Sequence, residues 1–133
     1  MKLKIKEQIP DTEIFHLVNG EPQKSKLREI LGNGKIILFG LPGAFTSTCS
    51  KIHLPGFVLN ADKIKAKGIK NIFCISANDP YVMNAWGEIN KTGNKIKMLS
   101  DPYLSFTKAI GAEVDRNSKG MGIRSNRYAM VIE

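Results

Sequence analysis

Residues 35–49 read KIILFGLPGAFTSTC, and this stretch decides what kind of fold the chain can adopt. Residues 36–39 are all apolar, which is typical of a strand buried in the middle of a sheet. The next helix is predicted to begin near Pro42. Cys49 therefore stands where a loop leaves a central strand and becomes a helix, a position at which ligands gather in α/β sheets.

The segment before this stretch predicts a β-hairpin, and the segment after it predicts a helix. Residues 12–18 alternate in a strand-like way and run into Asn19-Gly20, a dipeptide that favours a tight hairpin turn. Apolar residues then recur at helical spacing between Thr48 and Lys67. Pro55-Gly56 interrupts this pattern, so a kink is expected there.

Strands and helices go on alternating through the rest of the chain. The predicted order is a strand over Ile69–Ser76, a helix from Asn78-Asp79-Pro80 to about Ile89, a strand over Lys95–Leu99, a helix from Ser100-Asp101-Pro102 to Gly111 and a last strand over Arg127–Ile132. This order predicts an α/β protein, and a thioredoxin-like arrangement suits it.

Composition narrows the class of protein. With 133 residues, of which 42% are hydrophobic, the chain can bury the core of one domain. The net charge of +8 comes from lysines scattered along the chain, which favours a solvated surface and predicts no nucleic-acid partner. No apolar run is long enough for a membrane helix and the charged N-terminus predicts no signal peptide, so a reducing cytoplasm with free thiols is expected.

The residues around Cys49 are suited to thiolate chemistry. A helix start carries partial positive charge and unpaired N–H groups, which lower the pKa of a thiol. Thr46 lies about one helical turn before Cys49, so its hydroxyl can reach the same pocket. Pro42 has no N–H to donate and can shield the thiolate from water.

Pro42, Thr46 and Cys49 form the pattern Pro-x-x-x-Thr-x-x-Cys, which resembles the active-site signature of the peroxiredoxins. Three more segments, at 49–57, 74–87 and 122–130, resemble the type II subgroup that includes the fifth mammalian enzyme. The resemblance implies a thioredoxin-like fold with a mixed central sheet flanked by helices. Members usually continue for a further strand and helix, so residues 1–133 are expected to be a single domain that lacks these last elements.

The resemblance also implies an activity. The family reduces hydrogen peroxide and alkyl hydroperoxides through a sulfenic acid, here on Cys49, and its arginine matches Arg127. An external thiol such as glutathione, glutaredoxin or thioredoxin would recycle the enzyme, and no metal or organic cofactor is implied. A homodimer is expected from the subgroup.

Several residues admit more than one interpretation. Cys74 lies in an apolar run and is interpreted as an inert core thiol, although in some type II members the matching cysteine has been proposed to resolve the sulfenic acid. His53 is interpreted as a packing residue or an indirect contributor to the pocket. Cys49, His53 and Cys74 lack the paired spacing of a structural zinc site.

Two choices stay open at this stage. Arg124 and Arg127 have an odd separation, so on one strand only one of them would face the pocket; the family pattern selects Arg127, with Arg124 as a supporting donor.

A non-enzymatic redox sensor or interaction protein, switched by oxidation of Cys49, is the alternative function. A thioredoxin-like oxidoreductase would normally carry Cys-x-x-Cys, whereas this chain has Thr46-x-x-Cys49.

Overall fold

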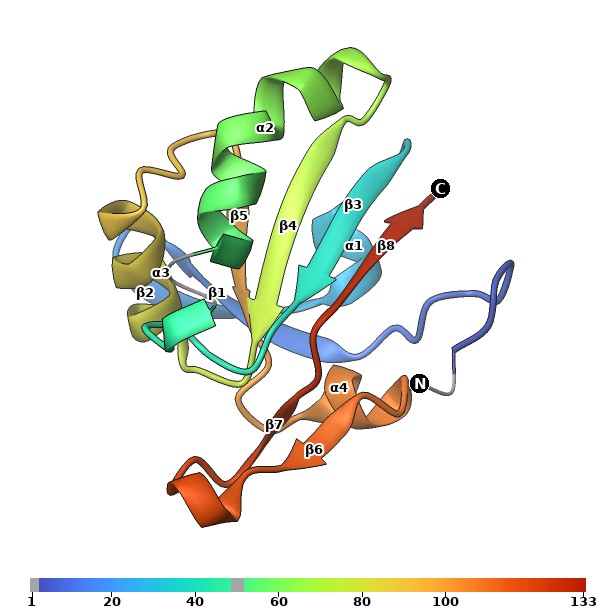
Figure 1. Cartoon of the computed structure of the whole chain (residues 1–133). Helices are drawn as coiled ribbons and strands as arrows, with labels where there is room; N and C mark the ends of the chain where they lie inside the picture. Colours follow the sequence, from blue (N-terminus) through green and yellow to red (C-terminus); the bar gives the residue numbers. More distant parts are fainter. Residues whose placement is uncertain (1–2, 49–51) are drawn as a thin grey trace.

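A computed structural model describes residues 3–48 and 52–133, in which a mixed β-sheet carries helices on both faces (Figure 1). Within these residues six strands pair in the order β2-β1-β5-β4-β3-β8. They are β1 (Glu13–Val18), β2 (Glu21–Lys26), β3 (Ile36–Gly40), β4 (Asn71–Ser76), β5 (Lys97–Ser100) and β8 (Tyr128–Ile132). The predicted α/β class, mixed central sheet and N-terminal hairpin are confirmed.

The strand β3 lies inside the sheet. It pairs in parallel with β4 and antiparallel with β8, and Leu38 and Phe39 are fully buried. The strand β5 continues the parallel part on the far side of β4. Because β3, β4 and β5 run in the same direction, the connections that follow them all leave from one end of the sheet.

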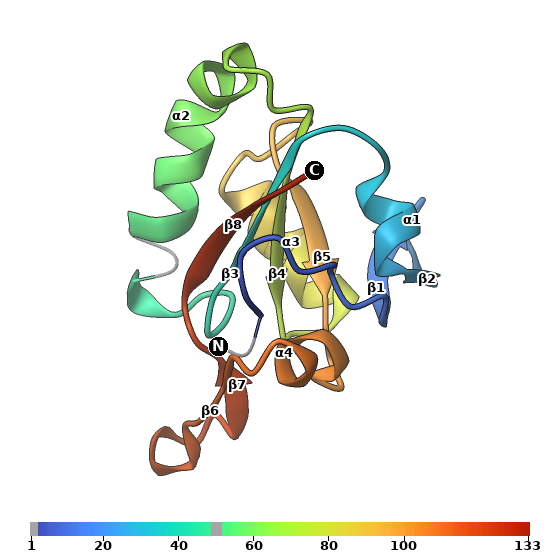
Figure 2. The ribbon, with the colours of Figure 1, turned by 90° about the vertical axis from the view of Figure 1, so that its right-hand side faces the viewer.

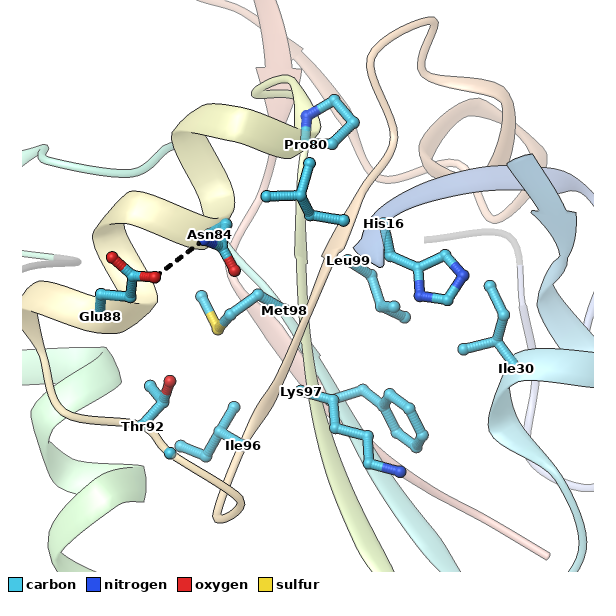
Figure 3. Close-up of a pocket in the computed structure, with 13 residues that line it drawn as sticks. His16, Ile30, Pro80, Asn84, Glu88, Thr92, Ile96, Lys97, Met98 and Leu99 are labelled. Atoms are coloured by element: carbon cyan, nitrogen blue, oxygen red, sulfur yellow. Dashed lines mark hydrogen bonds between the residues drawn. The ribbon is translucent and has the colours of Figure 1, made fainter. Parts of the chain in front are cut away.

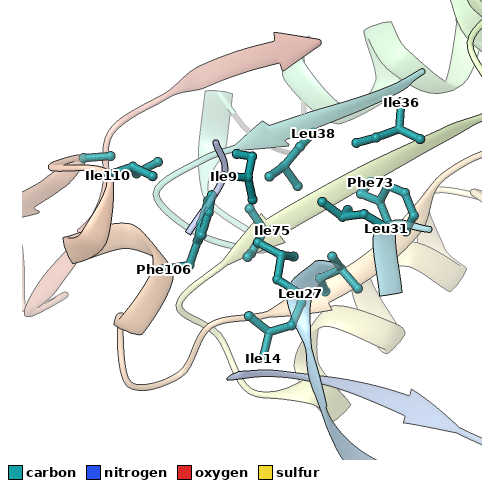
Figure 4. Close-up of a cluster of buried hydrophobic side chains, with 12 residues drawn as sticks. Ile9, Ile14, Leu27, Leu31, Ile36, Leu38, Phe73, Ile75, Phe106 and Ile110 are labelled. Atoms are coloured by element: carbon teal, nitrogen blue, oxygen red, sulfur yellow. The ribbon is translucent and has the colours of Figure 1, made fainter. Parts of the chain in front are cut away.

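Four α-helices cover the two faces of the sheet in the described part of the chain. They are α1 (Leu27–Leu31), α2 (Leu54–Ala66), α3 (Pro80–Ile89) and α4 (Ser105–Ala109). Residues of α2 and α3 pack in one apolar cluster. Residues of α1 and α4 pack in the other (Figure 4). Figure 2 shows α1 and α2 on opposite sides of the sheet. None of these described helices combines the length and the apolarity that crossing a membrane requires.

The hairpin has the tight turn that its sequence predicts. Val18 pairs with Glu21, so only Asn19 and Gly20 form the turn. Both have positive φ, 50° and 82°, and asparagine and glycine are the residues that tolerate this conformation best.

The two predicted helix starts differ in the structure. Asp79 caps α3 by accepting from the Val82 N–H at 3.0 Å, and the helix ends at Ile89 as predicted. Asp101 also accepts from N–H groups of α4, but that helix begins only at Ser105, after a turn. The expectation of a proline in the first turn is therefore wrong for α4.

The interruption expected at Pro55-Gly56 falls in the first turn of α2. Ile52 and His53 have π-helical geometry, and the α-helix begins at Leu54. Pro55 thus lies in the first turn, where its missing N–H leaves no hydrogen bond unmade. The local irregularity is a change from π to α geometry next to His53.

A small two-stranded sheet was not predicted. It consists of β6 (Glu113–Asp115) and β7 (Ile123–Ser125), joined through the short helix η2 (Asn117–Lys119), and it projects beyond α4 (Figure 1). Because Arg124 belongs to β7 while Arg127 immediately precedes β8, the two arginines do not share a strand. The expectation that only one of them faces the pocket rested on a shared strand, and that premise is wrong.

Gly40 ends β3 at a point where a side chain has no room. It pairs with Tyr128, and a Cβ atom on Gly40 would fall on the Tyr128 ring. The Tyr128 hydroxyl is buried and has no hydrogen-bond partner in the described part of the chain. Burial, with smaller contributions from Asp101 and Cys74, raises the pKa of Tyr128 far above its ordinary value, so the phenol stays neutral.

Gly40→Ala is therefore expected to destabilise the protein by about 1–3 kcal/mol, because the added methyl must displace the packed ring. Urea unfolding of the two proteins measures the difference. Gly56→Ala in α2 is the matched control: a Cβ there meets no atom within 4 Å, and alanine favours a helix by up to about 1 kcal/mol. Equal effects from the two substitutions would contradict this packing argument.

Candidate active site

The loop that follows β3 carries most of the residues that the sequence predicts for the site. Pro42 and Gly43 are buried, Thr46 is half-buried, and Ser47 and Thr48 are already helical. Cys49, the predicted nucleophile, lies outside the described residues. The described part of the site consists of the groups that surround the loop leading to Cys49.

Two side chains from distant segments close over Gly43. The Nη1 group of Arg124 donates to the Pro42 carbonyl at 3.1 Å, and the Ala44 N–H donates to Oδ1 of Asn78 at 2.8 Å. A Cβ atom on Gly43 would lie 2.6 Å from Arg124 Nη1 and 3.4 Å from Asn78 Oδ1. Residue 43 must be glycine for these two side chains to reach the loop backbone.

The Thr46 hydroxyl is oriented by the same loop. It donates to the Gly43 carbonyl at 2.7 Å, which uses its only hydrogen. Its oxygen keeps free lone pairs, so toward a bound molecule this hydroxyl acts as an acceptor. A ligand with an O–H group therefore suits this position.

Asn78 was predicted as part of a helix start, but its side chain instead accepts a hydrogen bond from the loop that follows β3. Asp79 caps α3, and Asn78 Oδ1 accepts from both Ala44 N–H and the Ser76 hydroxyl, the latter at 2.7 Å. The buried Ser100 hydroxyl donates to the Asn78 carbonyl. One side chain is enough to cap a helix, and the sequence has two candidates, Asn78 and Asp79, before α3. This surplus could have indicated that one of the two side chains hydrogen-bonds elsewhere.

Arg127 approaches the site from the opposite side of β3. Its Nη1 lies 3.0 Å from Nδ1 of His53, the residue immediately before α2. Burial, and then the Arg127 charge, lower the pKa of His53 below its ordinary value. Since a neutral ring can accept at Nδ1, Arg127 is the donor in this contact.

Aromatic packing fixes the His53 ring. Its centroid lies 5.1 Å from that of Phe39 and 5.6 Å from that of Phe57, and the two phenyl rings stack on each other at 4.0 Å. The ring that orients Arg127 is thus held by the core of the sheet. His53 packs against Phe39 and Phe57, and its contact with Arg127 was not predicted.

Cys74 is fully buried in β4, between Phe39 of β3 and Met98 of β5. This environment is that of a core thiol in a rigid strand. Among the described residues there is also no group of three or more His, Cys, Asp or Glu side chains arranged to hold a metal ion.

A cavity of about 450 Å³ lies elsewhere, between α3 and the N-terminal hairpin (Figure 3). His16, Asn84, Lys97 and Met98 are among its lining residues, and none of the lining residues belongs to the 41–48 loop. Asn84 donates to Glu88 at 3.2 Å within it. The cavity is therefore separate from the candidate active site.

Comparison with known proteins identifies the family. The Redoxin family matches residues 4–133. Peroxiredoxin-2D of Arabidopsis thaliana is 43% identical over 126 residues, which cover 94% of this chain and 78% of the relative. The chain belongs to the type II peroxiredoxins.

Solved structures agree with this assignment. The crystal structure of reduced Prx3 in complex with H₂O₂ from Vibrio vulnificus is 41% identical, with a TM-score of 0.93 over 98% of this chain and 82% of that one. Peroxiredoxin 5 from Alvinella pompejana is 36% identical, with a TM-score of 0.88 over 98% and 83%. This type II peroxiredoxin is accordingly a thiol-dependent peroxidase with a thioredoxin-like fold.

The two histidines predict how the stability of this peroxiredoxin depends on pH. Burial lowers the pKa of both His16 and His53 below their ordinary value of 6.5, so the folded chain binds fewer protons than the unfolded chain just below that pH. The free energy of unfolding is therefore expected to be highest above about pH 6.5 and to decrease as the pH falls through the lowered pKa values of the two histidines.

Urea unfolding at about pH 7.5, 6.5 and 5.5 measures this dependence. A variant with His16→Gln and His53→Gln is expected to lose less stability over the same interval, because it lacks both titrating rings. An identical loss in the variant and the parent would assign the effect to other groups.

Proposed function

We propose that this peroxiredoxin reduces hydrogen peroxide and alkyl hydroperoxides at Cys49, with Thr46, Arg127 and Pro42 as the other active-site residues. The observation that carries the proposal is the hydrogen bond from the Thr46 hydroxyl to the Gly43 carbonyl, 2.7 Å long. With its hydrogen used in this way, Thr46 can only accept, and a hydroperoxide offers it an O–H donor. The complex of a 41% identical relative with H₂O₂ supports this substrate class.

The reaction is a two-electron transfer from sulfur to the peroxide. The Cys49 thiolate attacks the O–H oxygen of the peroxide, so that an S–O bond forms as the O–O bond breaks. The sulfur becomes a sulfenic acid, and the leaving oxygen takes a proton to become water or an alcohol. A thiol then condenses with the sulfenic acid and releases water, and a second thiol reduces the mixed disulfide to regenerate Cys49.

Arg127 supplies the positive charge for this step. A guanidinium stays protonated and presents its donors in a fixed plane, so it can stabilise both a thiolate and the negative charge that develops on the breaking O–O bond. The contact with the neutral His53 ring, at 3.0 Å, uses one of its nitrogens and sets its orientation.

Pro42 contributes to the pocket because it has no backbone N–H group. It is buried, it has no N–H group, and its carbonyl already accepts from Arg124. It therefore adds no competing hydrogen bond to the pocket and helps to exclude water from the thiolate.

We propose a cycle in which Cys49 is the one reactive cysteine of this chain. Cys74 is 0% exposed in the central strand β4, and a bridge to it would require the two α-carbons to come within about 7 Å. An external thiol would then serve as reductant, with glutathione, glutaredoxin and thioredoxin as candidates. A reducing compartment such as the cytoplasm provides these reductants.

We also propose a homodimer that uses the surface next to the active-site loop. Phe45 and Tyr81 are 53% and 55% exposed, although they are large and partly apolar. Phe45 follows Ala44, whose N–H donates to Asn78, and Tyr81 lies in the first turn of α3, which begins two residues after Asn78. A second copy of the chain would cover both side chains.

The catalytic assignment predicts distinct effects of four substitutions on peroxide consumption, followed by stopped-flow methods with the reduced protein. Cys49→Ser is expected to abolish the fast reaction, and Cys74→Ser to preserve it. Thr46→Val and Arg127→Met are each expected to slow it by about 10²- to 10³-fold, as for the loss of a group that stabilises a transition state.

Intact mass spectrometry separates the alternatives. A trapped sulfenic acid in Cys74→Ser, with turnover sustained by added thiol, supports the one-cysteine peroxidase. A disulfide between Cys49 and Cys74 in the parent protein would overturn the one-cysteine cycle, and a single oxidation without turnover would favour a redox sensor.

Phe45→Asp is predicted to weaken the homodimer, as measured by sedimentation velocity over a range of concentrations. Phe45 has a φ of 64°, and aspartate tolerates this left-handed conformation, so the substitution removes apolar surface without straining the backbone. Tyr103→Asp is the control, because Tyr103 is 75% exposed in the turn before α4. Equal dissociation of both variants would contradict the proposed surface.

A further inference from the structure

The peptide unit between Gly43 and Ala44 is hydrogen-bonded at both ends. Its N–H, on Ala44, donates to Asn78 Oδ1 at 2.8 Å, and its C=O, on Gly43, accepts from the Thr46 hydroxyl at 2.7 Å. A peptide unit is planar and trans, so its N–H and C=O point in opposite directions. Whatever fixes the N–H therefore also fixes the direction in which the Thr46 hydroxyl must point.

Asn78 is well suited to fix that N–H. Its Oδ1 atom accepts a second hydrogen bond from the Ser76 hydroxyl at 2.7 Å, and its own N–H donates to the same hydroxyl at 3.2 Å. Its backbone carbonyl accepts from the buried Ser100 hydroxyl. Asn78 is thus tied to the ends of β4 and β5, which are parts of the rigid sheet.

Arg124 holds the preceding peptide unit. Its Nη1 donates to the Pro42 carbonyl at 3.1 Å, while its Nε donates to the Met121 carbonyl at 2.9 Å. The second contact fixes the guanidinium to the β6–β7 hairpin, in which Arg124 pairs with Val114. A lysine has one nitrogen and cannot make both contacts in this geometry.

We propose that Asn78, assisted by Arg124, is a positioning residue for peroxide reduction: it holds the Gly43–Ala44 peptide unit so that the Thr46 hydroxyl presents its lone pairs to the substrate. The proposal rests on the acceptor role proposed above for Thr46. Neither Asn78 nor Arg124 needs to contact the peroxide. Both would act by keeping one hydroxyl in one orientation, which a half-buried loop would not maintain on its own.

A double-mutant cycle tests this, with the second-order rate constant for hydrogen peroxide as the readout and a pH at which the Cys49 thiolate is fully formed. Asn78→Ala is expected to slow the reaction about tenfold in the parent protein and less than about twofold in a Thr46→Val background. Asn78→Asp keeps an acceptor for both Ala44 N–H and Ser76, so it is expected to recover most of the rate. Asn84→Ala, in α3, is the matched control: Asn84 lines the separate cavity, where its side chain donates to Glu88, so this variant should retain the parent rate.

The outcomes are distinguishable. If Thr46→Val alone leaves the rate unchanged, the proposed role of Thr46 fails. If Thr46→Val slows the reaction but Asn78→Ala slows it equally in both backgrounds, the role of Thr46 stands and this inference is wrong. If Asn78→Ala does not fold, Arg124→Met enters the same cycle, and an additive result for Arg124→Met would also overturn the inference.

Discussion

The double pairing of β3 is the constraint on which the rest of the site depends. Because β3 lies between parallel β4 and antiparallel β8, the end of β4 and the start of β8 both meet the loop that follows β3. Asn78 follows the end of β4, and Arg127 immediately precedes β8. The hydrogen bonds that pair β3 with β4 and with β8 thus bring Asn78 and Arg127 to the same end of the sheet, although both are far from the loop in the chain.

The electrostatics of the site follow from partial burial. One cation, Arg127, lies against the His53 ring, and burial, followed by the charge of Arg127, lowers the pKa of that ring below its ordinary value. A second cation, Arg124, donates to backbone carbonyls instead of to an acid. The two arginines thus place positive charge beside Pro42 and His53, which precede and follow Cys49 in the chain, and positive charge near a thiol favours the thiolate.

Local sequence signals were sufficient for elements whose conformation is set by neighbouring residues. The Asn19-Gly20 turn and the Asp79 cap were predicted correctly because each depends on the φ preference or side chain of one or two residues. The β6–β7 hairpin was not predicted, since its strands are only three residues long and leave little periodicity to detect. The beginning of α4 was placed too early because a turn, closed by the hydrogen bond from Leu104 N–H to the Asp101 carbonyl, separates the capping Asp101 carboxylate from the helix that it caps.

The sequence by itself determined the chemistry: the spacing of Pro42, Thr46 and Cys49, and the family to which the chain belongs, can be read without coordinates. Only the tertiary structure decided which side chains hold that motif in place. Asn78 and Arg124 lie 34 and 82 residues from their hydrogen-bond partners in the loop. Hydrogen bonds over such separations depend on strand order and register, which no local pattern specifies.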